Sequence, residues 1–331
     1  NQGFGASDST TGLTLDNDDD NDGVADGEDE FPNDPSESVD SDGDGVGDNA
    51  DAYPNDSSRQ ALELDKALEL IADEGLSACV SGQANGASFV SDISRLDCHE
   101  QVSSVEGIQN FTGLKELFFN NPDFTDGAPI GALTDLERLS INWGNQVFSD
   151  IDPLKRLINL RYLSLDGSPV TDLSAITGMT RLEQLNLNYI QATDVSAILN
   201  LPRLQHLGLC QLPLNSPPDL RSLTSLMGLS FCNYNFVDLP LLVERLPDSI
   251  SYLGLQNSRI TSTTPFNKLK QLRHLDLHNN QVSSVELSDL PELDELHVGD
   301  NTVTEFRIKG APQLRKIRAS NNNLKDLSSL A

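Results

Sequence analysis

Positive charge is scarce in this sequence, and the scarcity limits the partners that the chain can bind. Lysine and arginine number 22 among 331 residues, against 51 aspartates and glutamates, so the formal net charge is −29. Residues 1–56 hold eighteen of the acidic residues and no lysine or arginine. Because nucleic-acid phosphates are bound by clusters of basic side chains, this balance argues against a nucleic-acid partner.

The sequence also lacks long apolar runs and the short motifs of common enzymes. No run of about eighteen apolar residues occurs, so we predict no membrane-spanning helix. The G-x-S-x-G, H-E-x-x-H, phosphate-loop and glycine-rich nucleotide motifs are absent, which favours a chain that is not an enzyme. The chain begins at Asn1 in a stretch rich in glycine, serine and threonine, and we expect residues 1–14 to be the flexible linker of a processed product.

An acidic repeat occupies residues 15–56. DDDNDGVADGEDEFPND runs from Asp18, and DSDGDGVGDNADAYPND runs from Asp40, 22 residues later. Each copy starts with the frame D-x-D-x-D-G and carries further acids at loop positions 9 and 12. Calcium takes about six to eight oxygen ligands, which alternating carboxylates and the backbone carbonyl at position 7 can supply. The predicted calcium ligands are Asp18, Asp20, Asp22, Val24, Asp26 and Asp29, then Asp40, Asp42, Asp44, Val46, Asp48 and Asp51.

This segment resembles the thrombospondin type 3 repeat in the form found in secreted proteins of marine bacteria. The resemblance implies an extended arm that calcium stabilises, with Phe31 and Tyr53 providing local packing where the animal repeats have cysteines. One alternative is a disordered acidic linker, because the segment has few apolar residues to bury. An EF-hand fits less well, since Pro32, Pro35 and Pro54 leave no room for flanking helices.

A longer repeat begins at residue 93. The frame L-x-x-L-x-L recurs at steps of 21, 22 or 24 residues in about eleven copies, as in LRYLSL at 160, LEQLNL at 182 and LRHLDL at 272. This period predicts an α/β solenoid, a leucine-rich repeat horseshoe in which each copy adds one strand to a single parallel sheet. We assign it to residues 93–331, with positions 3, 5 and 7 of each copy facing the concave side.

The segments between the predicted strands indicate which type of leucine-rich repeat this is. SDIDPL and TDLSAI resemble the convex side of bacterial internalin-type repeats, and the resemblance implies short 3₁₀ or irregular convex segments. The consensus asparagine at position 9 is present in the last copies, as Asn280, Asn301 and Asn322. In the middle copies it is replaced by Ile190, Leu212 and Tyr234. Because buried turn groups there need other partners, we expect irregular structure around residues 188–240.

Residues 57–92 are predicted to form a helical cap over the first strand. Residues 57–78 carry apolar side chains at helical spacing, and the open edge of a solenoid has to be covered. The segment looks like the N-terminal cap of secreted bacterial leucine-rich repeat proteins, which implies a disulfide between Cys79 and Cys98; two buried thiols are the alternative. Cys210 and Cys232 occupy position 7 of neighbouring copies, so their Cα atoms should lie about 4.8 Å apart. A disulfide and two free thiols are both compatible with that distance.

The stretch HLDLH, residues 274–278, has two possible meanings. On a helix the two histidines would share one face and could bind one metal ion. On a strand they lie roughly 13 Å apart, and the repeat places them on a strand. A metal held by His297, Asp276 and one of these histidines is a further alternative.

The concave face is the predicted binding surface. Tyrosine and histidine combine ring area with hydrogen-bonding tips, which is typical of binding hot spots. The predicted contact residues are Tyr162, Tyr189, His206, Tyr252, His274 and His278. We predict an extracellular or cell-surface recognition or adhesion protein that binds a protein or glycan there. The alternative is a structural spacer, or a targeting module of a larger envelope protein or secreted enzyme.

Overall fold

The computed structural model describes residues 17–51, 54–55, 57, 62–120, 122–143, 147–234 and 238–324. The chain divides into two compact units, one of Asn1–Glu69 with Gly86–Asp92 and one of Leu70–Asn85 with Ile93–Ala331. The predicted linker and the predicted packing residue Tyr53 lie outside the described residues. The predicted cap segment, residues 57–92, is divided between the two units.

The first unit contains the acidic repeat. Residues 17–51 form successive turns and bends. The segment is followed by α1 (Leu64–Glu69) and η1 (Val90–Asp92). An isolated β-bridge pairs Asp51 with Leu62, so the end of the acidic repeat is hydrogen-bonded to the residues that lead into α1.

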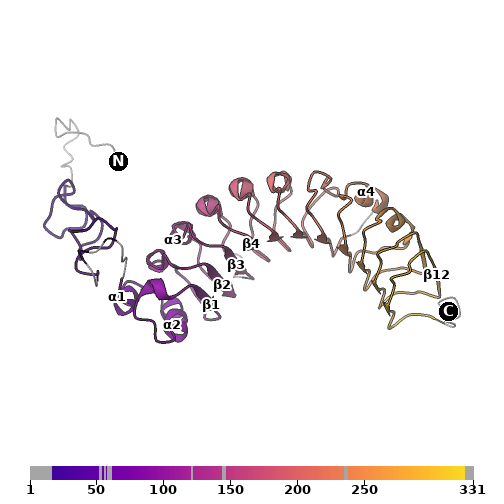
Figure 1. The fold of residues 1–331 in the computed structure, drawn as a ribbon, viewed down its shortest axis with the longest axis horizontal. Helices are drawn as coiled ribbons and strands as arrows, with labels where there is room; N and C mark the ends of the chain where they lie inside the picture. The colour runs from indigo at the N-terminus through magenta and orange to yellow at the C-terminus, as the bar shows by residue number, and fades with distance from the viewer. Residues whose placement is uncertain are drawn as a thin grey trace. The chain divides into compact units, whose positions relative to one another are not determined.

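The second unit is built on one long parallel sheet. Its strands follow one another in sequence order from β1 to β9 and then β11 and β13; β10 and β12 do not belong to this sheet. Equivalent positions of neighbouring repeats pair with each other, for example Leu163 with Leu185. Figure 1 shows these strands along one side of the unit and short helices along the other. The eleven strands are β1 (Arg95–Cys98), β2 (Glu116–Asn120), β3 (Arg138–Asn142), β4 (Tyr162–Ser164), β5 (Gln184–Asn186), β6 (His206–Gly208), β7 (Gly228–Ser230), β8 (Tyr252–Gly254), β9 (His274–Asp276), β11 (Glu295–His297) and β13 (Lys316–Arg318).

This sheet confirms the leucine-rich repeat prediction, because each strand falls on one copy of the leucine frame. The three leucines of a frame point into the core: Leu160, Leu163 and Leu165 are each fully buried. Burying one such side chain stabilises a fold by roughly 1.5–3 kcal/mol. Since side chains alternate along a strand, the residues between the leucines point to the opposite, concave face.

The convex side consists mainly of short 3₁₀ helices, as the internalin resemblance implies. These are η2 (Ile108–Asn110), η3 (Asp152–Arg156), η4 (Ser174–Gly178), η5 (Ser196–Asn200) and η6 (Thr264–Lys268), with α3 (Ala128–Gly131) and α4 (Leu239–Glu244) between them. Proline stands in the first turn of α3, η3, α4 and η6, where its missing N–H costs no hydrogen bond.

The prediction of a single sheet is wrong at the C-terminal repeats. There β10 (Ser284–Ser288) and β12 (Glu305–Lys309) form a second, two-stranded parallel sheet on the return segments. The cause is a change of period: Val285 and Leu287 are buried while the residues on either side of them are not, which is the alternation of a strand.

The N-terminal segment contains two helices where the apolar pattern predicts one. After α1 ends at Glu69, α2 (Glu74–Gln83) begins behind Asp73, whose carboxylate accepts the N–H of Leu76 at 2.7 Å. This N-cap starts a separate helix, so the prediction of one continuous helix is wrong at residues 70–73.

Within the second unit, α2 lies against the edge of β1. The side-chain amide of Gln83 donates to the carbonyl of Asp97 and accepts its N–H, both at 2.9 Å. These two bonds replace the partner strand that the outer edge of β1 lacks.

Position 9 of the C-terminal repeats carries buried asparagines that form a ladder of hydrogen bonds. Asn280 accepts the N–H of Ser258 at 3.0 Å and donates to the carbonyl of Leu255 at 2.9 Å. In the middle of the chain the sheet runs on without a break, while the return segment between β6 and β7 has no helix. The expected irregularity around residues 188–240 is therefore found on the convex side and not in the sheet.

Candidate functional site

The two acidic frames fold alike. In the first, the Asp26 carboxylate accepts the N–H of Asp19 at 2.8 Å; in the second, the Asp48 carboxylate accepts the N–H of Ser41 at 2.7 Å. In each loop, the predicted ligand at position 9 thus connects the end of the loop to the residue at position 2 through one carboxylate oxygen. The same sequence period has produced the same loop twice.

The glycine at position 6 turns each loop. Gly23 has φ of 100° and Gly45 has φ of 93°, a region that other residues avoid. Their N–H groups donate to the first aspartate of the frame, to Asp18 at 3.2 Å and to Asp40 at 2.8 Å. These turns bring the first three aspartates of each frame together.

The three aspartates of each frame offer a cation site. One carboxylate oxygen from each member of a set lies within 4.8 Å of the others, in the sets Asp18, Asp20, Asp22 and Asp40, Asp42, Asp44. The Oδ2 atoms of Asp20 and Asp42 are buried and accept no hydrogen bond. Partial burial, with the charges of nearby aspartates, raises the pKa of Asp20. A hard divalent cation such as calcium would satisfy both conditions, since it needs oxygen ligands and offsets their repulsion.

The other predicted ligands follow these sets along the same two loops of the sequence. Asp29 and Asp51, at loop position 12, are buried. The N–H groups of Val24 and Val46 donate to the third aspartate of their frames, at 2.7 Å and 2.9 Å. The chain therefore places every predicted ligand in the same two loops, with three carboxylates of each loop in one group.

Two glutamates that the sequence frame does not include also belong to this region. Glu30 accepts the N–H of Asp40 and so connects the first frame to the second. Glu37 is buried and accepts the N–H of Asn49 at 3.1 Å, and a side chain at Gly47 would collide with it. Neither glutamate occupies a repeated position, so the repeat gave no signal for them.

The predicted contact residues of the concave face come from several strands of the sheet, of which only β8 and β9 are neighbours. His206 on β6 and Tyr252 on β8 are exposed, whereas Tyr162 on β4 and His274 on β9 are half-buried. Tyr252 and His274 are direct register partners. Gly228 separates His206 from Tyr252, and a Cβ there would lie 2.5 Å from the His206 ring. The structure thus places Tyr252 beside His274 and lets the His206 ring rest against the backbone of Gly228.

Arginine and aromatic side chains alternate across the first strands. The guanidinium of Arg95 lies over the Phe118 ring at 4.6 Å, and that of Arg138 lies over the Tyr162 ring at 4.5 Å. Phe118 and Tyr162 have ring centroids 6.5 Å apart. The prediction includes Tyr162 but not the arginines, although Arg95 and Arg138 occupy position 3 of their copies of the leucine frame.

The HLDLH stretch is extended and not helical: β9 covers its first three residues, and His278 follows the end of the strand. Its second histidine contacts side chains of the next repeat. The rings of His278 and His297 stack with centroids 5.0 Å apart. His297 lies 3.2 Å from a carboxylate oxygen of Asp276, and His278 lies 3.3 Å from one of Asp300. Among the residues that the structure describes, these side chains do not form a group of three potential ligands within 4.8 Å, so the geometry gives the metal alternative no support.

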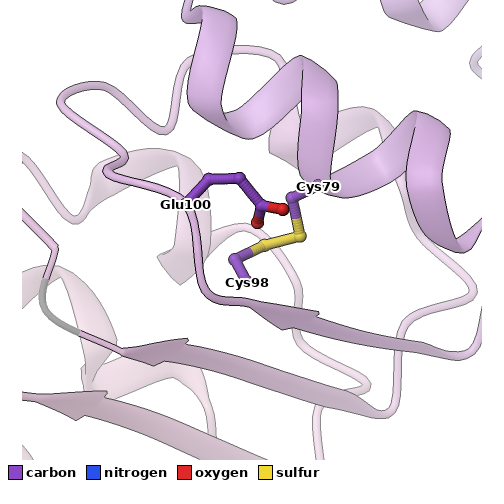
Figure 2. Close-up of side chains that lie close together, drawn as sticks. All are labelled: Cys79, Cys98 and Glu100. Atoms are coloured by element: carbon purple, nitrogen blue, oxygen red, sulfur yellow. A yellow bond between two sulfur atoms is a disulfide. The ribbon is translucent and has the colours of Figure 1, made fainter.

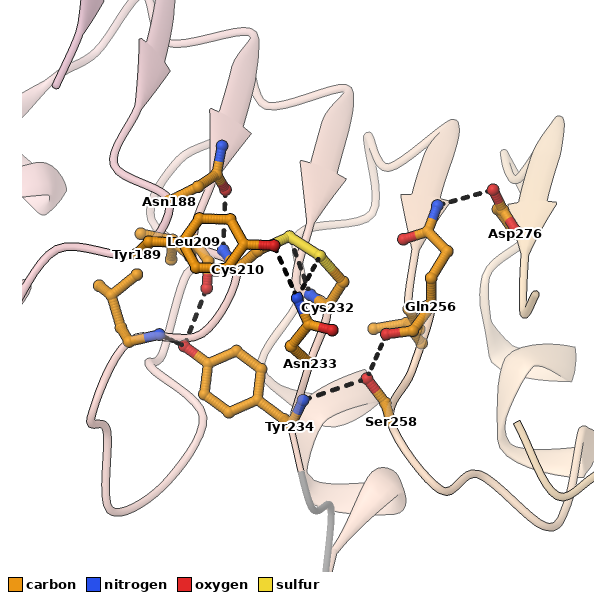
Figure 3. The surroundings of a disulfide bond; sticks show 12 residues. Asn188, Tyr189, Leu209, Cys210, Cys232, Asn233, Tyr234, Gln256, Ser258 and Asp276 are labelled. Atoms are coloured by element: carbon orange, nitrogen blue, oxygen red, sulfur yellow. Dashed lines mark hydrogen bonds between the residues drawn. A yellow bond between two sulfur atoms is a disulfide. The ribbon is translucent and has the colours of Figure 1, made fainter. Parts of the chain in front are cut away.

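Both pairs of cysteines are bonded. Cys79 of α2 is joined to Cys98 of β1, with Cα atoms 5.2 Å apart (Figure 2). Glu100 lies beside this bond, but bonded sulfurs are not thiolate ligands, so this group is no metal site. Cys210 is joined to Cys232 across neighbouring repeats, at a Cα distance of 4.5 Å (Figure 3).

The edge of the concave sheet carries a hydrogen-bonded tyrosine and an exposed tryptophan. The Tyr189 hydroxyl accepts a hydrogen bond from the Asn233 amide at 2.9 Å, next to the second disulfide (Figure 3). The Tyr189 ring lies 5.0 Å from the ring of Trp143. Of the two, only Tyr189 is among the predicted contacts, although both occupy position 8.

The parallel sheet, the leucine core and the position 9 ladder define a leucine-rich repeat solenoid. Residues 248–292 match the family described as leucine rich repeats, in two copies. No curated protein matches the sequence. Among the described residues, no helix has the length and apolar character needed to cross a membrane.

Two solved structures share this fold at low sequence identity. An internalin (inlF) from Listeria monocytogenes is 23% identical, with a TM-score of 0.56 over 80% of this chain and 94% of that chain. A leucine-rich repeat protein from Leptospira interrogans is 20% identical, with a TM-score of 0.52 over 70% of this chain and 73% of that chain. At such identities the likeness establishes the fold.

Proposed function

We propose that this chain is a non-enzymatic recognition or adhesion protein that binds a macromolecular partner on its concave sheet. The carrying observation is that eleven parallel strands form one uninterrupted surface whose outward positions hold exposed rings, Tyr252 and His206 among them. Solenoids of this kind present long concave surfaces of closely spaced side chains. Large exposed rings on such a surface supply contact area at little cost in side-chain entropy.

The arginine and aromatic side chains of β1 to β4 extend the proposed surface. Arg95 also pairs with Glu116, and Arg138 lies 4.0 Å from the same carboxylate, so the cations are held over their rings. Arginine and tyrosine, like tryptophan, are enriched among the residues that contribute most to binding at interfaces. We therefore add Arg138 to the predicted contacts on this face.

We further propose that the acidic repeat binds calcium and serves as a stalk that the ion stabilises. Its support is the pair of matching loops, each with three gathered carboxylates and one buried oxygen without a hydrogen bond. In the absence of a cation these charges repel one another. Bound calcium would supply the missing partner of Asp20 and of Asp42 and hold the turns in place.

An extracellular or cell-surface location is part of the proposal. All four cysteines are paired in two disulfides. Such bonds persist in oxidising compartments and are rare in the reducing cytosol.

The proposal is tested by comparing two double variants of the full chain for retention on the surfaces or matrix to which the wild type adheres. Tyr162→Ala with Tyr252→Ala removes rings from the concave face. Lys155→Ala with Lys268→Ala removes exposed charges from η3 and η6 on the convex face. The first variant is expected to lose adhesion and the second to keep it. Adhesion that survives the first variant and fails in the second would exclude the concave face; adhesion of neither wild type nor variant to any surface would favour a structural spacer.

A further inference from the structure

From the third copy of the repeat onward, the residue at position 8 has a left-handed backbone. The φ angles there lie between 52° and 76° from the third copy onward. Glycine, asparagine and aspartate adopt this conformation most readily. The residues at position 8 are Trp143, Gly167, Tyr189, Gln211, Asn233, Asn257, Asn279, Asp300 and Asn321.

Trp143 and Tyr189 depart from that preference. Their φ angles are 55° and 65°, in a region that is unfavourable for large side chains. Burial does not offset the cost at Trp143, because this residue is 54% exposed. Packing does not explain an exposed tryptophan in this conformation, and a half-buried tyrosine adopts the same conformation two copies later. The pair therefore indicates a binding role.

Gly167, in the copy between them, makes room for the pair. A Cβ at Gly167 would lie 2.6 Å from Cε3 of Trp143, so only glycine lets the indole rest over this strand end. The two ring centroids are 5.0 Å apart and the ring planes are inclined at 50°. The Tyr189 hydroxyl is held by the Asn233 amide. The rings therefore form a fixed platform at the edge of the sheet.

The side chains next to the platform are carboxamides and one carboxylate. Asn142 accepts the Ser164 hydroxyl at 2.8 Å and the N–H of Asp166 at 3.2 Å. The Asp166 carboxylate accepts both the N–H and the side-chain amide of Asn188, at 2.8 Å and 3.2 Å. These groups form a hydrogen-bonded row at position 7 of the third, fourth and fifth copies of the repeat, and each retains capacity for a further donor or acceptor.

We propose that Trp143 and Tyr189 form a binding site for a pyranose ring of a neutral glycan. The proposal rests on the proposed recognition function and names the ligand class for one part of its surface. The apolar C–H face of a pyranose carries partial positive charge and stacks on the negative face of an aromatic ring. Its hydroxyl groups can both donate to and accept from side-chain amides and carboxylates such as those of Asn142, Asp166 and Asn188.

Two observations disfavour other ligands at this point. Strands β3 to β6 are paired on both sides, so an extended peptide finds no free strand edge with which to form main-chain hydrogen bonds. The carboxylate of Asp166 and the net charge of −29 repel phosphorylated or acidic ligands. A neutral sugar needs neither a strand edge nor a positive charge.

The test uses the intrinsic fluorescence of the full chain, because Trp143 is its one tryptophan. Cellohexaose and chitohexaose serve as probes with flat, neutral pyranose rings. Titration with at least one of them is expected to shift the emission in a saturable way. Tyr189→Ala should weaken that binding by roughly tenfold or more, whereas Asn257→Ala, at the same repeat position three strands further on, should leave it unchanged.

A second variant separates binding from a structural role. Trp143→Asn suits the left-handed backbone, so it should abolish sugar binding in calorimetry without lowering Tm. A lower Tm for Trp143→Asn with sugar binding retained would overturn the proposal, as would the absence of a response to either sugar at millimolar concentration. A protein that alters Trp143 emission when both sugars fail would assign the pair to a protein interface and also overturn it. Failure with the sugars leaves the concave-face proposal intact, because that proposal is tested on a macromolecular partner through Tyr162 and Tyr252.

Discussion

The Tyr234 hydroxyl accepts the backbone N–H of Leu212, 3.0 Å away in the preceding repeat. It also donates to the carbonyl of Leu209 at 2.8 Å (Figure 3). The side chain of Asn280 binds the same two backbone positions, of Ser258 and Leu255, in its own preceding repeat. The Tyr234 hydroxyl thus makes the same two backbone hydrogen bonds as the asparagine side chain that occupies position 9 in the C-terminal repeats.

We expect Tyr234→Phe to destabilise the second unit by about 1–3 kcal/mol, because it leaves a backbone N–H and a carbonyl without their partner. The urea unfolding midpoint of the full chain measures the change. Tyr252→Phe, which removes a hydroxyl from an exposed ring, is the matched control and should leave the midpoint unchanged. Equal midpoints for Tyr234→Phe and wild type would show that water replaces the hydroxyl.

Alkaline pH should weaken the same contact. Burial raises the pKa of the Tyr234 hydroxyl above its ordinary value. The unfolded chain therefore ionises first, and the contribution of the neutral hydroxyl to stability is lost as pH rises above about 10. Unfolding midpoints measured on both sides of that pH should fall more steeply for wild type than for Tyr234→Phe. Parallel curves would mean that Tyr234 ionises equally in both states.

Calcium should order the acidic repeat. Adding chelator is expected to make residues 17–51 sensitive to protease, because the gathered carboxylates then repel one another. Asp20→Ala with Asp42→Ala should have the same effect in the presence of calcium and leave unfolding of the second unit unchanged. Glu28→Ala, an exposed acid outside both aspartate sets, is the control. Equal resistance with calcium and with chelator would contradict the proposed stalk.

The two disulfides should contribute similarly to stability. They span 19 and 22 residues, and in the chain-entropy treatment loops of this length are worth roughly 2–4 kcal/mol each. Cys79→Ser with Cys98→Ser and Cys210→Ser with Cys232→Ser should lower the unfolding midpoint by comparable amounts. A difference of more than about twofold would show that packing around one bond, and not chain entropy, dominates.

The strands of this fold could be predicted from sequence because the repeat period fixes which side chains are buried. A leucine at position 4, such as Leu163 or Leu185, must point into the core. Because side chains alternate along a strand, the residues on either side of it point to the concave face. The second sheet could not be predicted in this way. The alternation of buried and exposed residues around Val285 covers only the five residues of β10, which is too short to distinguish a strand from an irregular segment.

The candidate sites were predictable to a different degree. The aspartate frames repeat in sequence, and so the two loops were found together. The role of Tyr234 depends on how far its ring reaches into the preceding repeat, and the strain at Trp143 depends on a backbone angle. Neither quantity follows from the sequence period, so the sequence predicts neither the hydrogen bonds of Tyr234 nor a role for Trp143.

The most direct test of the central proposal is the affinity of single variants for the partner that the wild-type chain captures. Tyr252, on the concave face, is compared with Lys268, whose amine pairs with Glu244 at 2.8 Å on the convex face. Tyr252→Ala is expected to raise Kd by roughly 30-fold, a loss of about 2 kcal/mol, and Lys268→Ala to leave Kd unchanged. An unchanged Kd for Tyr252→Ala with a raised Kd for Lys268→Ala would contradict the assignment of binding to the concave sheet.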